Sequence, residues 1–66
     1  MQIYINGEQK QVSDNLIMSD LIEMLELTGQ RIAVEINEEL VPRSTFSSHQ
    51  LSEGDQVEIV NAIGGG

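Results

Sequence analysis

The first twelve residues alternate in a way that predicts a β-hairpin. Over residues 1–5, apolar and more polar side chains alternate with the period of two that marks a strand with one buried face. Asn6-Gly7 follows, and both residues accept the positive φ angles of a two-residue hairpin turn. Residues 8–12 then return as a polar strand, which we expect at the edge of the sheet.

The apolar period lengthens after Asn15 and predicts one helix. Four apolar residues are spaced as i, i+3, i+4 and i+7, which places them on one helical face. These residues are Met18, Leu21, Ile22 and Leu25. Gly29 is expected to end the helix in a left-handed conformation. The start is less well defined, because Ile17 is a poor N-cap residue.

The second half of the chain predicts three further strands. They cover residues 32–36, 40–41 and 56–60, each rich in Val, Ile or Leu. Pro42 ends the middle one, because proline has no N–H to give to a ladder. Residues 44–50 show no period and are expected to form a loop or a single helical turn.

The predicted order is β-β-α-β-β-β, which favours an α+β fold. We expect a mixed sheet of about four or five strands with one helix packed across one face. The domain is expected to span residues 1–60, with residues 61–66 as a flexible tail. The predicted core combines the helical face with one face of the sheet, namely Met1, Ile3, Ile5, Ile32, Val34, Ile36, Val57 and Ile59.

Composition narrows the chemistry. The 66 residues contain no cysteine and one histidine, His49, which argues against disulfides, common structural zinc sites and iron–sulfur ligation. No metal site is predicted.

The formal net charge is −8, which argues against binding to nucleic acid or to anionic membranes and favours a basic protein partner. No apolar run is long enough to cross a bilayer and no secretion signal is evident, so a cytoplasmic protein is expected.

The printed sequence ends in three glycines that directly follow the last predicted strand and a short connector. Glycine has no Cβ, so Gly64, Gly65 and Gly66 could enter a narrow channel in a partner where side chains would clash. The extended reach from Asn61 to Gly66 is roughly 20 Å. The sequence therefore points to the Gly66 carboxylate as the working group.

Several segments in this order resemble the ThiS family of bacterial sulfur carriers, within the ThiS/MoaD branch of the ubiquitin-like β-grasp superfamily. The segments are residues 34–37, 41–43, 51–55, 57–60 and 64–66. The resemblance covers essentially the whole chain. It departs at Phe46, where such chains often carry tryptophan.

The resemblance implies a carrier and not an enzyme. An ATP-dependent ThiF/E1-like enzyme would convert the Gly66 carboxylate into an acyl-adenylate, and a persulfide from a donor such as a cysteine desulfurase would make it a thiocarboxylate. A ThiG-like thiazole synthase would then receive the sulfur for thiamine biosynthesis. ATP and Mg²⁺ would be used by the activating partner, so no cofactor is expected on this chain.

A docking surface is predicted beside the tail. Tyr4, Ala33 and Val60 should lie on the sheet face away from the helix, and Ile63 could join them in an apolar patch. Arg43 is a further candidate, either as an ion-pair partner within the fold or as a contact with the activating enzyme.

Three other functions remain open from the sequence. The first is the small subunit of molybdopterin synthase, with the same chemistry and another acceptor. The second is a protein modifier that forms isopeptide bonds, for which Lys10 offers little opportunity for chain-building. The third is a non-covalent β-grasp interaction domain with an inert tail.

Overall fold

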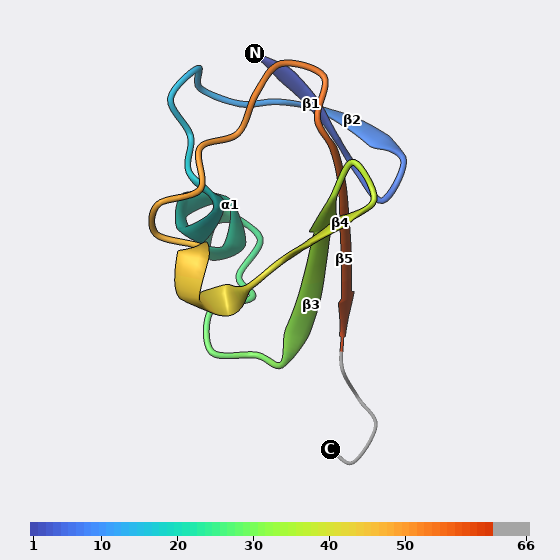
Figure 1. The fold of residues 1–66 in the computed structure, drawn as a ribbon. Coiled ribbons are helices and arrows are strands. Elements are labelled where there is room, and N and C mark those ends of the chain that lie inside the picture. The colour runs from blue at the N-terminus through green and yellow to red at the C-terminus, as the bar shows by residue number, and fades with distance from the viewer. Residues whose placement is uncertain (62–66) are drawn as a thin grey trace.

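The computed structural model describes residues 1–61 as a five-stranded mixed sheet packed against one helix (Figure 1). The elements along the chain are β1 (Gln2–Ile5), β2 (Glu8–Gln11), α1 (Met18–Met24), β3 (Ile32–Ile36), β4 (Glu39–Val41), the 3₁₀ helix η1 (Arg43–Thr45) and β5 (Gln56–Asn61). The predicted α+β class and the β-β-α-β-β-β order are confirmed.

The last strand of the chain lies in the middle of the sheet. The spatial order is β2-β1-β5-β3-β4, so β5 pairs in parallel with β1 on one side and antiparallel with β3 on the other. The parallel pairing is short and joins only Tyr4 to Gln56 and Ile5 to Val57, whereas the β3–β5 ladder runs from Ile36 to Ile32.

Two tight turns close the two hairpins. Asn6 and Gly7 have φ angles of 50° and 87°, both positive as a type I′ turn requires. Asn37 and Glu38, between β3 and β4, have φ angles of 53° and 71°. The hairpin predicted from Asn6-Gly7 is confirmed, as is the tight connection after residue 36.

The helix ends earlier than predicted. Leu25 is the C-cap, and Glu26 adopts a positive φ of 60° in place of the expected Gly29. The Leu27 N–H donates to the Ile22 carbonyl and the Glu26 N–H to the Glu23 carbonyl, both at 3.0 Å, which is the bonding of a Schellman motif. Gly29 belongs to the following turn instead, with φ of 82°.

The helix start is satisfied by a distant loop and not by a capping side chain. Ile17 occupies the N-cap without a side-chain bond. The N–H groups of Met18 and Ser19 donate to the carbonyls of His49 and Phe46 at 2.8 and 3.0 Å. Tertiary contact therefore replaces the local cap that the sequence lacks.

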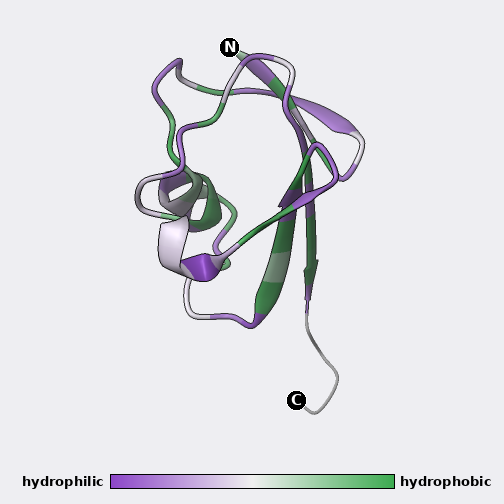
Figure 2. Ribbon diagram, viewed as in Figure 1, coloured by the Kyte–Doolittle hydropathy of each residue, from purple (hydrophilic) through white to green (hydrophobic). Residues whose placement is uncertain are grey.

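The core lies between α1 and the inner sheet face. Figure 2 shows hydrophobic residues along β3 and β5, whereas β2 is hydrophilic. The buried apolar residues are Ile3, Leu16, Met18, Leu21, Ile22, Val34, Ile36, Val41, Leu51, Val57 and Ile59. The sequence pattern missed Leu16, Val41 and Leu51, which come from loops and a short edge strand where no period is visible. Met1, Ile5, Leu25 and Ile32 are only partly buried against this core.

Several strand boundaries differ by one residue from the sequence prediction, including the start of β1 at Gln2 and the end of β2 at Gln11. β4 begins at Glu39, one residue earlier, and β5 continues to Asn61, one residue later. The 3₁₀ helix η1, Arg43–Thr45, begins one residue before the predicted loop or helical turn of residues 44–50.

Candidate functional site

The candidate site begins where β5 ends. Four residues named from the sequence, Ile63, Gly64, Gly65 and Gly66, lie outside the described residues 1–61. The structure therefore defines the base from which they start and the surface around that base. The β5 terminus lies at the opposite end of the sheet from the chain's N-terminus (Figure 1).

The end of β5 is held from both sides. On one side, Val60 pairs with Ala33 and Asn61 with Ile32 of β3. On the other side β1 has already ended, and the Asn6 side chain forms the hydrogen bonds to β5 in its place. Its Nδ2 donates to the Ile59 carbonyl at 3.2 Å, and its Oδ1 accepts from the Ile59 N–H at 2.9 Å.

The start of β5 is fixed by a buried carboxylate. Asp55 is 8% exposed, and its two oxygens accept from the Ser52 N–H at 2.8 Å and from Asn37 Nδ2 at 3.1 Å. Asn37 Oδ1 in turn accepts from the Gln56 N–H at 3.0 Å. The Asp55 carbonyl also accepts from the Tyr4 N–H, so this network ties β5 to β1 and to the turn after β3.

The outer sheet face carries two of the predicted docking residues, Tyr4 and Val60. Val60 is 57% exposed, lies across from half-buried Ala33, and Leu40 on β4 is 68% exposed. Tyr4 lies on the same face, since its pairing partner Gln56 is four residues before Val60 along β5. That spacing separates Tyr4 from Val60 by about 13 Å. The register thus places Val60 beside Ala33 near the end of β5, and it places Tyr4 of β1 beside the start of β5.

Tyr4 lies among glutamines. Its hydroxyl accepts from Gln2 Nε2 at 2.9 Å, and Gln2 Oε1 accepts from Gln9 Nε2 at 2.8 Å. The β1–β2 half of the outer face is therefore polar and uncharged around Tyr4. The β5–β3–β4 half, in contrast, combines exposed apolar and acidic side chains.

The acidic pair in that half is unusual because its members face each other. Glu35 on β3 lies directly across from Glu58 on β5, and both are exposed. Like charges directly opposite in a sheet are destabilising. Neither carboxylate is in an ion pair within residues 1–61.

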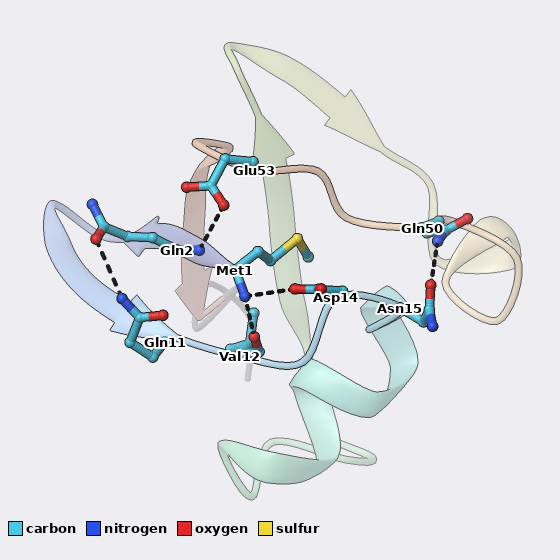
Figure 3. A network of polar contacts seen from close by, with 8 residues as sticks. All are labelled: Met1, Gln2, Gln11, Val12, Asp14, Asn15, Gln50 and Glu53. Carbon is cyan, nitrogen blue, oxygen red and sulfur yellow. Dashed lines mark hydrogen bonds and ion pairs between the residues drawn. The ribbon is translucent and has the colours of Figure 1, made fainter.

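Residues 1–61 contain one ion pair, between the Met1 ammonium and Asp14, at the end of the sheet away from the β5 terminus (Figure 3). The N-terminal ammonium of Met1 donates to Asp14 Oδ1 at 2.9 Å and to the Val12 carbonyl at 2.6 Å. The hydrogen bond from this ammonium, helped by its charge, lowers the pKa of the Asp14 carboxyl from its ordinary value. Nearby, the Gln2 N–H donates to Glu53 Oε1 at 3.1 Å (Figure 3).

Arg43 bonds a backbone carbonyl and not a carboxylate. Its Nη2 donates to the Gln30 carbonyl at 2.7 Å, two residues before β3 begins. Together with Ile22, Ile32 and Phe46 it lines a pocket of about 240 Å³ at the C-terminal end of α1. Arg43 thus braces the loop before β3, while its side chain stays exposed.

Residues 1–61 contain no group of three or more His, Cys, Asp or Glu side chains placed to hold a metal ion. Over the same range, no helix has both the length and the apolar character needed to cross a membrane.

The arrangement of strands and helix defines a ubiquitin-like β-grasp domain. A crystal structure of the thiamine biosynthesis protein ThiS from Geobacter metallireducens matches it with a TM-score of 0.86 at 29% identity, and the match covers 100% of both chains. The ThiS family model matches residues 3–66. The chain therefore belongs to the ThiS family, which consists of small sulfur carriers.

Two curated relatives place the chain within this family. The sulfur carrier protein ThiS of Escherichia coli K12 is 32% identical over 66 residues, which is 100% of each chain. A thiazole synthase of Paramagnetospirillum magneticum is 38% identical over 66 residues, but the chain spans only 20% of that protein's length. The ThiS-like segment of that relative is thus part of a longer polypeptide.

The sequence did not reveal the side-chain bonds that two turn residues, Asn6 and Asn37, make to β5. Asn6 was recognised as a turn residue because of Gly7, but its side-chain bonds cross to β5, which is far away in the sequence. Only the pairing of β1 with β5 reveals them.

Proposed function

We propose that this chain is the sulfur carrier for thiazole formation in thiamine biosynthesis, with the Gly66 carboxylate as the group that is activated. The observation that carries the proposal is that the family match runs through the terminal glycines to residue 66. The exposed apolar side chain of Val60, beside the end of β5, supports a docking surface at the same end of the sheet.

The proposed chemistry starts from an unreactive group. An α-carboxylate is ionised at neutral pH and resists nucleophiles. Attack of the Gly66 carboxylate on ATP, in a ThiF/E1-like partner with Mg²⁺, forms the acyl-adenylate and releases pyrophosphate. The terminal sulfur of a persulfide then attacks the carbonyl carbon and AMP leaves. A second thiol reduces the resulting acyl disulfide, which leaves a thiocarboxylate on Gly66.

In this proposal residues 1–60 form the folded body and residues 61–66 act as the tail, whose first residue, Asn61, still pairs with β3. ATP, Mg²⁺ and the sulfur donor, such as a cysteine desulfurase, are held by partners and not by this chain. The thiazole synthase that receives the sulfur is proposed from the relatives that carry this segment within a thiazole synthase. Docking is proposed at Val60 and Tyr4 on the outer face, at Ile63 in the tail, and at Arg43, which lies beside the loop before β3.

Intact mass spectrometry tests the proposal. The chain is incubated with a ThiF-type enzyme, ATP, Mg²⁺, a cysteine desulfurase and cysteine. The expected result is a mass increase equal to exchange of one oxygen for sulfur at Gly66. Gly65→Val should abolish the exchange without changing the melting temperature, because a Cβ at that position would obstruct the partner's channel.

The other outcomes would each overturn the proposal. A stable bond between Gly66 and other proteins would indicate a modifier. An unmodified chain would indicate a non-covalent interaction domain. Sulfur transfer to a molybdopterin precursor, with none to a thiazole synthase, would indicate the other carrier function.

A further inference from the structure

The two hairpin turns carry asparagines that hold opposite ends of β5. Asn6 and Asn37 each occupy the first turn position, with φ angles of 50° and 53°. Each also bonds β5 through its side chain, Asn37 at Gln56 and Asn6 at Ile59. The turn geometry alone does not require these bonds, because glycine satisfies the same positive φ.

The Asn6 side chain acts as a substitute for a strand residue. The backbone N–H of Asn6 donates to the Val57 carbonyl at 2.8 Å, which is the last backbone bond from this segment to β5. Beyond that point its carboxamide presents one donor and one acceptor to Ile59, just as a paired backbone amide would. The β1 side of the ladder is therefore extended to Ile59 after β1 has turned away.

This bond pair lies directly before the base of the tail. Ile59 is two residues before Asn61, the last described residue, and Ile59 also anchors β5 in the core through a buried side chain. Without the carboxamide, this end of β5 would be held by β3 alone. The direction in which the chain leaves the sheet would then vary more.

We propose that Asn6 is a positioning residue for the activation of Gly66, because it fixes the direction in which the tail leaves the domain. The inference rests on the proposed carrier function. Reaction rates depend on the fraction of bound complexes in which the reacting atoms are aligned. Loosening the tail base lowers that fraction while the docking surface stays unchanged.

The test compares Asn6→Gly with the matched control Asn37→Gly. Both variants keep a residue suited to positive φ, and both lose side-chain bonds to one end of β5. Asn6→Gly is expected to lower kcat for Gly66 adenylation by roughly five- to tenfold with little change in KM. Asn37→Gly is expected to leave both constants unchanged, although it disturbs the contact with buried Asp55 and destabilises the fold at least as much.

Hydrogen exchange of the isolated chain supplies a readout that does not depend on the partner. Asn6→Gly should accelerate exchange at the Ile59 N–H, whereas Asn37→Gly should accelerate it at Gln56. Asn6→Asp provides a second variant if Asn6→Gly folds poorly. It suits the turn and still accepts from Ile59, but it loses the donor to the Ile59 carbonyl, and a similar loss of kcat is expected.

Each remaining outcome counts against the proposal. Equal kinetics for the wild-type chain and both Asn6 variants would overturn it, as would equal kcat losses in Asn6→Gly and Asn37→Gly. An unchanged exchange rate at the Ile59 N–H would show that the Asn6 side chain does not hold this part of β5. If the wild-type chain is not adenylated at all, the proposed function fails first and the inference falls with it, which the wild-type assay alone reveals.

Discussion

The two ends of β5 are built differently. At its start, buried Asp55 joins the strand to the turn after β3 and to β1 through side-chain and backbone bonds. The ammonium of Met1 and the Gln2–Glu53 bond add further links at that end of the sheet. At its finish, the strand has its pairing with β3 and the two bonds from Asn6.

This difference separates the end of β5 that stabilises the fold from the end that a partner would reach. At the start of β5 the buried Asp55 carboxylate is hydrogen-bonded, and the loss of a partner there would leave an unsatisfied buried group. The opposite end carries exposed Val60 and leads into the glycine tail. We expect changes at the start of β5 to alter folding and changes at its finish to alter docking to the partner or activation by it.

The largest effect is expected from Asp55→Ala. The change removes both acceptors for the Ser52 N–H and Asn37 Nδ2 in a site that is 8% exposed. The free energy of unfolding should fall by about 2–4 kcal/mol, measured by urea denaturation. Glu53→Ala is the control, because this exposed side chain makes one bond, and it should cost about 1 kcal/mol or less. Equal losses would contradict the contrast between the ends.

A moderate effect on binding is expected from Val60→Asp. The new charge would enter the exposed apolar part of the outer face, so the Kd for the adenylating enzyme should rise about tenfold, or about 1.4 kcal/mol. The melting temperature should change little, because Val60 is 57% exposed. Gln9→Asp, on the polar half of the same face, should leave the Kd unchanged. An unaltered Kd for Val60→Asp would exclude this part of the face from docking.

A smaller effect, of opposite sign, is expected from Glu58→Gln. Removing one charge relieves repulsion with Glu35 directly opposite, so stability should increase by about 0.2–1 kcal/mol. The gain should shrink in high salt, because exposed charges are screened. Glu8→Gln is a matched control, since Glu8 lies across from Ile5. Thermal unfolding at two salt concentrations measures both variants, and a gain independent of salt would argue against repulsion as the cause.

The smallest effect is expected from Asp14→Asn and depends on pH. The N-terminal ammonium lowers the pKa of Asp14 in the folded chain, so the ionised form is favoured by folding. Its contribution is present above the unfolded pKa and is lost as the pH falls through the lower, folded value. Asp14→Asn should therefore flatten the acid limb of the melting-temperature profile. An unchanged acid limb would show that the pair contributes nothing.

Local sequence signals predicted most of the fold but not the side-chain links. The alternation in residues 1–5, the Asn6-Gly7 turn and the helical spacing from Met18 to Leu25 identified elements correctly because each signal is contained within a few neighbours. Gly29 was a misleading signal, since glutamate at position 26 took the left-handed conformation instead.

Long-range contacts account for the rest. Leu16 and Leu51 enter the core from loops that pair with each other, as the Leu51 N–H donates to the Leu16 carbonyl at 2.9 Å. For the site, the glycine tail was visible in the sequence. The bonds from the Asn6 side chain to Ile59 were not visible, because residues 6 and 59 meet only in the folded sheet.

The central position of β5 has a consequence for how the chain folds. During synthesis the hairpins of β1–β2 and β3–β4 emerge first, but each is a two-stranded unit of marginal stability. They cannot join until the strand between them arrives, so closure depends on contacts between residues far apart in sequence, which slows folding. The nascent domain therefore remains open to proteases until β5 leaves the ribosome.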